Sequence, residues 1–536
     1  MAEGKAHESD VLGTLMSLTV AFTLAMAFRG FVLEGFVIPT GSMGPTLMGA
    51  HLRVNDPVTG YEYAADATPA LGAPRPDVLA AIFDPMLSRT QSIGVERASE
   101  LAANARAGDR VLVLKPLFLF SEPRRWDVVV FKNPTDPVGD TQNYIKRLVG
   151  LPDETLLLFD GDVFTGPLNA DTQQLKIQRK PEYVQRAVWQ PIYDSDYEPL
   201  VSTQQLETAM RAKWPGPPWV GAGATAGEWK TAPQRAWTHP AGQAALHWND
   251  AAWAINDWNA YNMLRPPPPL FAVSDLRLCA AVDCADPLNF STTFALAAGK
   301  QRCTFTLKGS GTVTVKREVI ESGETLNEAS YSFEPNAEGL LWFEFWRVDQ
   351  AMWVFVNGSM VGRLEYDFAT LGDRLESSMY GRTADDYVRS PTDPRAPSPA
   401  VLDWTFNSAA PFALHRVRID RDLYYRPAFH DPQNQFAING DEIKGPAFAT
   451  DWQHPAKLQK DEFLMLGDNS AASRDGRLWG RAHRLSLLTF GDAQPGVVPR
   501  DMIVGKAWCV YFPAPLPLTP GGATFIPDFG RLRFIR

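Results

Sequence analysis

One serine of the chain lies in a turn whose composition suits a nucleophile. Ser42 belongs to the stretch IPTGSMGPTL (residues 38–47), where two prolines restrict the backbone and Gly41 permits conformations that a side chain would block. Most serines in such turns are only turn residues, because a serine attacks a carbonyl only when a neighbouring base takes its proton. The sequence has no Gly-x-Ser-x-Gly elbow and no histidine in a comparably distinctive pattern, so a Ser-His-Asp triad is not predicted.

A lysine offers the alternative base. Lys146 lies in the strand-like stretch YIKRLVG (residues 144–150), where strict alternation places it on the same apolar face as Tyr144 and Leu148. Because burial disfavours a charged amine, we expect its pKa to fall from about 10.4 toward about 7 to 8, at a cost of roughly 4 kcal/mol. A neutral amine can take the serine proton. The alternative is a surface lysine beside Arg147 with its head group in solvent.

A third segment, MLGDNSAASRDGR (residues 465–477), is dense in turn-forming and charged residues, which alone indicates only turns and caps. In chain order, however, IPTGSMGPTL, WDVVVF, YIKRLVGLP and LGDNSAASRDGR resemble the conserved boxes of bacterial type I signal peptidases, which use a Ser-Lys dyad. The resemblance covers roughly residues 11–57, 108–165 and 435–536. It implies a membrane-anchored serine endopeptidase that removes N-terminal signal peptides from exported preproteins after a small-x-small motif.

The resemblance also implies a role for individual residues. Ser42 matches the nucleophile, Lys146 the general base, and Thr40 the residue whose hydroxyl joins the Ser42 backbone N–H in the oxyanion hole. Ser473 matches a serine that hydrogen-bonds the lysine amine. Supporting positions, the last two as an ion pair, are Gly467, Asp468, Asn469, Asp475 and Arg477. Residues that match the shallow substrate pockets for small side chains are Phe36, Ile38, Pro39, Met43, Leu47, Tyr144 and Ile145.

The sequence departs from the family pattern in places. Where the family usually has GLPGD, residues 150–154 read GLPDE, so that Asp153 replaces a glycine, the acid becomes Glu154, and the turn could be altered. Gly476 stands where the family usually has a serine, and residues 469–473 keep the spacing with a different polar filler. None of these changes removes a catalytic role, so an active enzyme is predicted.

The amino-terminal region contains a candidate membrane helix. Residues 11–28 are 18 consecutive uncharged residues, about 27 Å of helix, close to the hydrocarbon thickness of a bilayer. A cleavable secretory signal is the alternative, because residues 25–27 (AMA) have the small-x-small form. Against it, the residues before the apolar run carry Lys5 but also Glu3, Glu8 and Asp10, whereas the start of a signal should be basic. Lys5 and Arg29 on the two flanks do not decide orientation. The family resemblance implies a single-pass protein of the cell inner membrane, with the catalytic domain on the extracytoplasmic side.

Composition bounds the remaining possibilities. A chain of 536 residues predicts two or three folding units, and a net charge of -10 with scattered basic residues argues against a nucleic-acid partner. With four cysteines, eight histidines and no CxxC or HExxH motif, neither a metal nor another cofactor is predicted. Outside the cytoplasm Cys279 and Cys284 could close a small disulfide loop, with Cys303 or Cys509 as other candidates.

Short runs rich in valine, threonine and phenylalanine predict a mainly β fold. We expect one helix near residues 95–106 and a hairpin turn at Asn357-Gly358, and we expect PGPP (215–218) and PPPP (266–269) to prevent regular ladders around them. The predicted organisation is an N-terminal tail (1–10), a transmembrane helix (11–28), a first peptidase part (30–165) with an insertion at about 48–107, a Trp/Pro-rich insertion (166–271), an antiparallel β-sandwich insertion (272–426) and a second peptidase part (435–536).

The sandwich insertion allows a second functional hypothesis. The stretch LWFEFWRVDQAMWVFVNGSMVG resembles the back-to-back strands of concanavalin-like or laminin-G-like sandwiches, many of which bind carbohydrate. The chain could therefore be a membrane-anchored glycan- or protein-binding protein on an inactive peptidase core. Its expected partners are preprotein signal peptides, the lipid bilayer and a possible ligand of the sandwich. A self-cleaving repressor, which shares Ser-Lys chemistry, would need a DNA-binding motif where residues 11–28 form a membrane segment.

Overall fold

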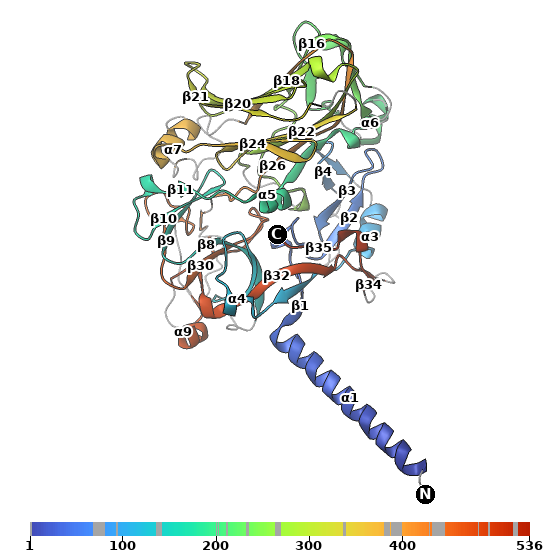
Figure 1. The fold of residues 1–536 in the computed structure, drawn as a ribbon, viewed down its shortest axis with the longest axis vertical. Coiled ribbons are helices and arrows are strands. Elements are labelled where there is room, and N and C mark those ends of the chain that lie inside the picture. Colours follow the sequence, from blue (N-terminus) through green and yellow to red (C-terminus); the bar gives the residue numbers. More distant parts are fainter. Residues whose placement is uncertain are drawn as a thin grey trace.

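The structure is a computed structural model in which antiparallel strands predominate, so the predicted mainly β class is confirmed. It describes residues 3–67, 81–92, 95–135, 142–199, 201, 203–210, 213–231, 235–262, 270–335, 339–379, 386, 399–427, 429–430, 445–480, 482–490, 494–517 and 524–536. In Figure 1 one long helix projects from the base of a body whose upper part is a sandwich of two sheets.

The projecting helix is α1 (Glu3–Phe31). Within the described residues it is the helix that is long and apolar enough to cross a membrane, over Val11–Phe31, and none of that stretch is buried. A core helix of a soluble domain would be buried, so this exposure favours a segment that meets lipid. The predicted membrane anchor is thus supported, and the alternative of a cleaved signal segment stays open.

Strands from both ends of the chain form the first sheet. Its order is β1 (Leu33–Val37), β6 (Arg110–Leu114), β32 (Ile503–Phe512), β7 (Val128–Lys132), β8 (Asn143–Gly150), β30 (Glu462–Leu466) and β31 (Val497–Pro499), with β35 (Arg533–Phe534) paired to β32. All neighbouring pairs are antiparallel, and β7 pairs with β8 so that Val129 lies opposite Lys146. This interleaving brings two parts of the sequence, far apart along the chain, into one sheet.

A second, four-stranded sheet also combines both parts. Its order is β11 (Lys176–Ile177), β10 (Asp162–Pro167), β9 (Glu154–Phe159) and β29 (Ala456–Leu458). The turn before β9 forms although Asp153 replaces the usual glycine, because Asp153 adopts the left-handed region with φ 61°. Glu154 accepts the Leu151 N–H at 2.8 Å and pairs with Arg125 at 2.6 Å, which holds the turn.

The insertion is a two-sheet sandwich. One sheet has the order β14 (Lys230–Thr231), β15 (Trp237–His239), β26 (Phe412–Arg421), β17 (Leu276–Cys284), β22 (Leu341–Val348), β23 (Ala351–Val356) and β24 (Ser359–Glu365), with β12 (Gln190–Asp194) on β26. The other has the order β13 (Trp219–Gly221), β16 (Gly242–Trp248), β25 (Val401–Ser408), β18 (Phe290–Ala298), β19 (Gln301–Lys308), β20 (Thr312–Val319) and β21 (Thr325–Ser332). Both sheets share one apolar core, in which Phe305 stacks on Phe345 at 5.2 Å between ring centroids.

The expectation that prolines prevent regular ladders in the Trp/Pro-rich segment is wrong. Strands β12, β13, β15 and β16 all lie within residues 166–271 and join the two sandwich sheets. Pro215–Pro218 precede β13 rather than interrupt it, and Trp219 and Trp248 pack into the shared core. The PPPP stretch at 266–269 lies outside the described residues. The sandwich therefore begins well before residue 272.

The smaller elements complete the fold. Two-stranded pairs are β2 (His51–Asn55) with β3 (Glu62–Asp66), β4 (Ala81–Asp84) with β5 (Arg89–Ser92), β27 (Phe429–His430) with β28 (Gly445–Pro446), and β33 (Leu516–Pro517) with β34 (Thr524–Ile526). Helices are α3 (Val95–Ala103), α4 (Leu117–Phe120), α5 (Glu182–Val188), α6 (Thr203–Met210), α7 (Leu371–Met379) and α9 (Arg484–Phe490). The predicted helix near 95–106 is thus α3, and the predicted turn joins β23 to β24 with φ 50° at Asn357 and 82° at Gly358.

The suggested disulfides do not form. All four cysteines are free thiols, and Cys279 and Cys284 lie on the same strand, β17. Five residues of extended strand separate two Cα atoms by roughly 16 Å, whereas a disulfide needs them within about 7 Å. The spacing that suggested a small loop is instead a stretch of extended strand, paired with β22 and, through one register shift, with β26.

Buried ion pairs tie the sandwich to the four-stranded sheet. Lys180, which follows β11, pairs with Asp349 at 2.6 Å and with Asp422 at 2.9 Å, both on the sandwich. Arg374 of α7 pairs with Asp160, in the turn between β9 and β10, at 2.8 Å. Charges removed from water need their partners in place, so these pairs fix the sandwich relative to the peptidase part.

The turn before β9 yields a test of local strain. Asp153→Val should lower the free energy of unfolding by about 1–2 kcal/mol, because a β-branched residue is strained in the left-handed region, while Asp153→Gly should be neutral or slightly stabilising. Chemical denaturation of both variants measures the difference. Equal stability of the two variants would contradict a left-handed backbone at position 153.

Candidate active site

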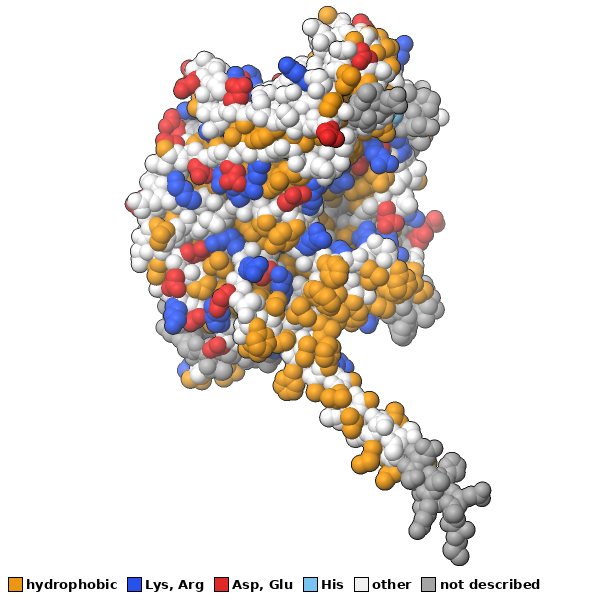
Figure 2. Space-filling view, viewed as in Figure 1, with side chains coloured by type: hydrophobic (Ala, Val, Ile, Leu, Met, Phe, Trp, Pro, Cys, Tyr) orange, Lys and Arg blue, Asp and Glu red, His pale blue; other side chains and the backbone are white. Residues whose placement is uncertain are grey.

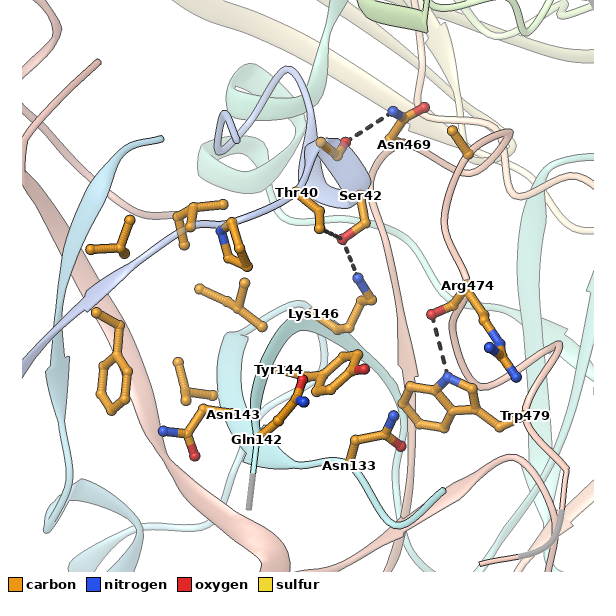
Figure 3. Close-up of a pocket in the computed structure, with 18 of the residues that line it drawn as sticks. Thr40, Ser42, Asn133, Gln142, Asn143, Tyr144, Lys146, Asn469, Arg474 and Trp479 are labelled. Carbon is orange, nitrogen blue, oxygen red and sulfur yellow. Dashed lines mark hydrogen bonds between the residues drawn. The ribbon is translucent and has the colours of Figure 1, made fainter. Parts of the chain in front are cut away.

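A cleft of about 520 Å³ lies where the turn after β1 meets β8 and the segment after β30. Figure 3 shows Thr40 and Ser42 with Asn469 next to their turn, Lys146 and Tyr144 on β8, and Arg474 and Trp479 farther along the cleft. The lining residues are Phe36, Val37, Ile38, Pro39, Thr40, Gly41, Ser42, Asp66, Val130, Asn133, Thr135, Gln142, Asn143, Tyr144, Ile145, Lys146, Asn469, Ala472, Arg474 and Trp479. The cleft is open on one side and has both apolar and polar walls.

Ser42 and Lys146 meet in this cleft. Ser42 lies in a short 3₁₀ turn, η1 (Gly41–Met43), and is half-buried, while Lys146 lies in the middle of β8 with 2% of its surface exposed. Lys146 Nζ is hydrogen-bonded to Ser42 Oγ, across 104 positions of sequence (Figure 3). A hydroxyl beside an amine is the pairing that nucleophilic catalysis by a Ser-Lys dyad requires.

Burial sets the protonation of the lysine. Desolvation lowers the pKa of Lys146 from 10.5 to about 8, although the Asp475 and Asp468 carboxylates favour the charged form. Near pH 8 about half of this amine is therefore uncharged and able to accept a proton, a fraction that an unperturbed lysine does not reach until above pH 10. The alternative of a surface lysine with a solvated head group is wrong, because the side chain is buried on the apolar face of β8.

Hydrogen-bond donors lie next to the serine hydroxyl. Thr40 is exposed to the cleft, and its Oγ1 donates to Ser42 Oγ at 3.4 Å. In the η1 turn the Gly44 N–H donates to the Gly41 carbonyl at 2.8 Å. The Ser42 N–H comes earlier in the turn, where backbone N–H groups have no hydrogen-bond acceptor within the turn. The Thr40 hydroxyl is thus next to the Ser42 hydroxyl, and the oxyanion role assigned to Thr40 and the Ser42 amide stays a prediction.

The segment after β30 supplies a buried ion pair behind the lysine. Arg477 Nε donates to Asp475 Oδ1 at 2.9 Å and a second guanidinium N–H donates to Asp475 Oδ2 at 2.8 Å. The Gly467 N–H donates to the same carboxylate at 2.9 Å. Burial alone would raise the pKa of Asp475, but Arg477 and these hydrogen bonds hold it below its ordinary value. The predicted pairing of Asp475 with Arg477 is present.

A second buried ion pair was not foreseen from the sequence. Arg147 donates to both carboxylate oxygens of Asp468, at 2.8 and 2.6 Å, and to the Trp126 carbonyl at 2.8 Å. Thr46 Oγ1 also donates to Asp468, at 2.6 Å, which links this pair to the serine turn. The local sequence gave no signal that Arg147 is buried, because its partner Asp468 lies 321 positions away.

Asn469 holds the serine turn directly. Its backbone N–H donates to the Ser42 carbonyl at 3.1 Å, and its Nδ2 donates to the Gly41 carbonyl at 2.9 Å. Two carbonyls of the turn that carries the hydroxyl are therefore fixed by one residue. The predicted supporting position at Asn469 thus contacts the serine turn itself.

Ser473 does not make the expected bond to the lysine. Among the described residues Ser473 Oγ has no hydrogen-bond partner, and it is packed against Gly467, where a β carbon would collide with it. Gly476, which replaces the usual serine, has no room for a side chain either, since a β carbon there would lie 2.6 Å from the Gly496 carbonyl oxygen. The role assigned to Ser473 stays a prediction.

Most of the expected substrate-pocket residues line the cleft, and two do not. Phe36, Ile38, Pro39, Tyr144 and Ile145 line it, whereas Met43 and Leu47 have no exposed surface and pack into the core beneath β1 and β6. Both side chains point into the protein and belong to the same buried cluster as Ile38 and Val130, which line the cleft. Lining residues that the sequence did not suggest include Asn133, Gln142, Asn143, Arg474 and Trp479.

The comparison with known families matches this arrangement. The family model described as "Signal peptidase, peptidase S26" matches residues 11–205 and 413–512, which is more than half of the chain. The chain belongs to the peptidase S26 family of signal peptidases. Both matched ranges contribute to the cleft, the first with Ser42 and Lys146 and the second with Asn469 and Trp479. The family resemblance drawn from the sequence is thereby confirmed.

Two relatives are both signal peptidase I. That of Rickettsia typhi is 26% identical over 148 residues, 28% of this chain and 40% of the relative. That of Buchnera aphidicola is 27% identical over 143 residues, 27% of this chain and 30% of the relative. The chain thus matches less than half the length of either relative.

Solved structures with partial likeness to this S26 family member are β proteins. The carbohydrate-binding module CBM66 from Bacillus subtilis is 7% identical with a TM-score of 0.23, covering 38% of this chain and 95% of the module. The laminarinase catalytic domain from Thermotoga maritima is 7% identical with a TM-score of 0.26, covering 44% and 99%. TM-scores of this size do not establish a shared fold.

The buried ion pair predicts a large stability effect. Asp475→Asn leaves the Arg477 guanidinium buried without a carboxylate, so the free energy of unfolding should fall by about 3–5 kcal/mol. Denaturant unfolding measures the change. As the matched control, Asp367→Asn removes a half-exposed partner of Arg179 and should change stability by less than about 1 kcal/mol. A loss at Asp475 no larger than at Asp367 would contradict the burial of the Asp475–Arg477 pair.

Proposed function

We propose that this chain is an active serine endopeptidase that cleaves signal peptides from preproteins with Ser42 as nucleophile and Lys146 as general base. The observation that carries the proposal is the hydrogen bond between a buried lysine amine and a serine hydroxyl at the wall of an open cleft. No metal or cofactor enters this chemistry. An inactive peptidase core under a binding sandwich gives no reason for an amine to be held in this unfavourable position.

The reaction proceeds by two acyl transfers. The uncharged Lys146 amine takes the proton of Ser42 Oγ as that oxygen attacks the scissile carbonyl carbon. The Thr40 hydroxyl and the Ser42 N–H donate to the resulting oxyanion. The lysine ammonium then gives its proton to the leaving amine, which departs as the C–N bond breaks and leaves an ester on Ser42. Lys146 next takes a proton from a water molecule as the water oxygen attacks the ester carbonyl carbon. The bond from that carbon to Ser42 Oγ then breaks, the lysine ammonium returns its proton to Ser42 Oγ, and the signal peptide leaves with a free carboxylate.

The cleft walls favour small side chains next to the cleaved bond. Phe36, Ile38 and Ile145 present apolar surface near the serine, and the volume is shared with the polar side chains of Asn143 and Gln142. Shallow apolar pockets accept alanine-like residues and exclude larger or charged ones. The same apolar wall that lowers the lysine pKa thus selects the residue before the scissile bond.

The short connection between the cleft and α1 supports a location at the membrane surface. Strand β1 follows α1 directly and leads into the Ser42 turn. Figure 2 shows apolar surface on the body where α1 leaves it, and exposed apolar side chains on α1 and on the neighbouring α4 and β32 include Phe31, Leu119, Phe120 and Trp508. We place the protein in the cell inner membrane with one span and an extracytoplasmic catalytic part, where membrane-inserted preproteins are concentrated.

Two variants test the dyad. Ser42→Ala removes the nucleophile, and Lys146→Arg keeps the positive charge but cannot lose a proton near neutrality, so both should reduce preprotein cleavage in detergent by at least about a thousandfold. Lys300→Arg, on an exposed sandwich position, is the control and should cleave normally. Thermal unfolding shows that the inactive variants are folded. Retained cleavage by folded Lys146→Arg would refute the assignment.

The lysine predicts the pH dependence. Below pH 8 most Lys146 amines are protonated and cannot take the serine proton, so kcat/KM should rise about tenfold per pH unit and level off near pH 8. Cleavage rates of a signal-peptide substrate from pH 5.5 to 9 measure the profile. A kcat/KM that is constant below pH 7 would show that another group acts as base.

A further inference from the structure

The serine turn is covered by a segment that does not belong to the family match. Residues 257–262, which end in η6 (Ala260–Asn262), lie between β16 and β17 of the inserted sandwich, and the family model matches only residues 11–205 and 413–512. The segment nevertheless reaches the turn that carries Ser42. Three of its side chains, those of Asn259, Tyr261 and Asn262, contact the turn or the residue that holds it.

Tyr261 packs on the backbone of the turn. Its ring is 2% exposed, and a β carbon at Gly41 would collide with it, while one at Gly44 would lie 3.1 Å from a ring carbon. The ring therefore occupies the space in which a side chain at position 41 would lie. The φ of Gly41 is not in the left-handed region, so the backbone conformation does not require a glycine there. Glycine is needed at position 41 because a β carbon would collide with the Tyr261 ring.

Asn262 fixes the amide of Asn469. The two side chains exchange hydrogen bonds of 2.6 Å in both directions, Nδ2 of each donating to Oδ1 of the other. The second Nδ2 hydrogen of Asn469 is thereby directed at the Gly41 carbonyl, at 2.9 Å. With the amide turned over, Asn469 would present an oxygen to that carbonyl, and the bond would be lost.

Asn259 adds a third link. Its Nδ2 donates to the Gly44 carbonyl at 3.1 Å, and its Oδ1 accepts the Tyr261 N–H at 2.9 Å, which shapes the short turn that presents the tyrosine. One side chain thus sets both the local turn and its contact with the serine loop. The carbonyls of Gly41 and Gly44 are held from the insertion side.

The segment is itself fixed to the sandwich. Asp257 exchanges hydrogen bonds of 2.9 Å with Phe271 and pairs with Arg426 at 2.5 Å. The Arg426 N–H donates to Ser470 Oγ at 2.9 Å and its carbonyl accepts from Arg477 at 2.8 Å, so the same pair reaches the segment after β30. A clamp formed by residues 257–262 and Arg426 therefore contacts both loops that meet at Ser42.

We propose that Asn262, together with Tyr261 and Asn259, is a positioning residue for the reaction: the insertion completes the active site by holding the Ser42 turn through Asn469 and Gly41. The inference rests on the proposed function for its kinetic consequence. Asn262 does not line the cleft, so it acts on kcat through the position of the hydroxyl rather than on substrate binding.

Asn262→Ala is the test, because this half-buried side chain can be removed with little risk to the fold. With a signal-peptide substrate we expect kcat to fall about tenfold or more and KM to change less than about twofold. The pH at which kcat/KM levels off should stay near 8, since Lys146 remains buried. Asn262→Asp, which keeps the size but places a carboxylate against Asn469 Oδ1, should lose at least as much. Asn289→Ala is the control, because Asn289 is an exposed sandwich asparagine whose side chain donates to Asp286, its partner among the described residues.

Hydrogen–deuterium exchange tests the clamp independently of catalysis. Peptides spanning residues 38–50 should exchange faster in Asn262→Ala than in wild type or Asn289→Ala, while the sandwich strands exchange at the same rate. Unchanged exchange at 38–50 overturns the inference in every case. If the wild type cleaves, two kinetic results also overturn the inference: an Asn262→Ala variant with the same kcat as the wild type, or a variant that loses activity only because it is globally unfolded. If the wild type does not cleave, the proposed function fails and exchange alone decides the clamp.

Discussion

Lys146 carries its amine on the buried face of β8, where protonation is unfavourable because no water solvates the charge. A pKa that falls from 10.5 to about 8 corresponds to roughly 3 kcal/mol, which the packing around the strand must offset. Two acids lie close enough to reverse this shift. Each is paired in a two-point contact with an arginine, Asp468 with Arg147 and Asp475 with Arg477, so their attraction for the ammonium is reduced and burial decides the outcome.

One of these pairs, Arg147 with Asp468, also joins the two distant ranges of sequence that form the peptidase part. Arg147 lies on β8, in the first range, and Asp468 follows β30, in the second, while Thr46 joins the serine turn to the same carboxylate. A charge pair this deeply buried is tolerated only with all its partners present. The sheet that interleaves the two ranges therefore also completes the electrostatic environment of the lysine.

Local sequence patterns correctly predicted the elements that are determined by residues close together in the sequence. The apolar run of α1, the alternation of β8 that buries Lys146, and the Asn357-Gly358 turn depend on residues within a few positions, and all are present in the structure. Features that depend on distant partners were missed or misassigned. The burial of Arg147 and the inward direction of Met43 follow from tertiary packing, and a two-cysteine spacing cannot distinguish a loop from the extended β17.

The insertion is where sequence patterns were least informative and where the structure adds most to the site. A sandwich that served only as a spacer would need one flexible connection at each end, yet this one is held by buried pairs such as Lys180 with Asp349 and reaches the serine turn through Tyr261. Gly41 has a conformation open to any residue, so the contact with Tyr261, rather than the turn itself, requires a glycine there. The identity of the residue next to Ser42 thus depends on a side chain 220 positions away, and the two parts of the protein cannot vary independently at this point.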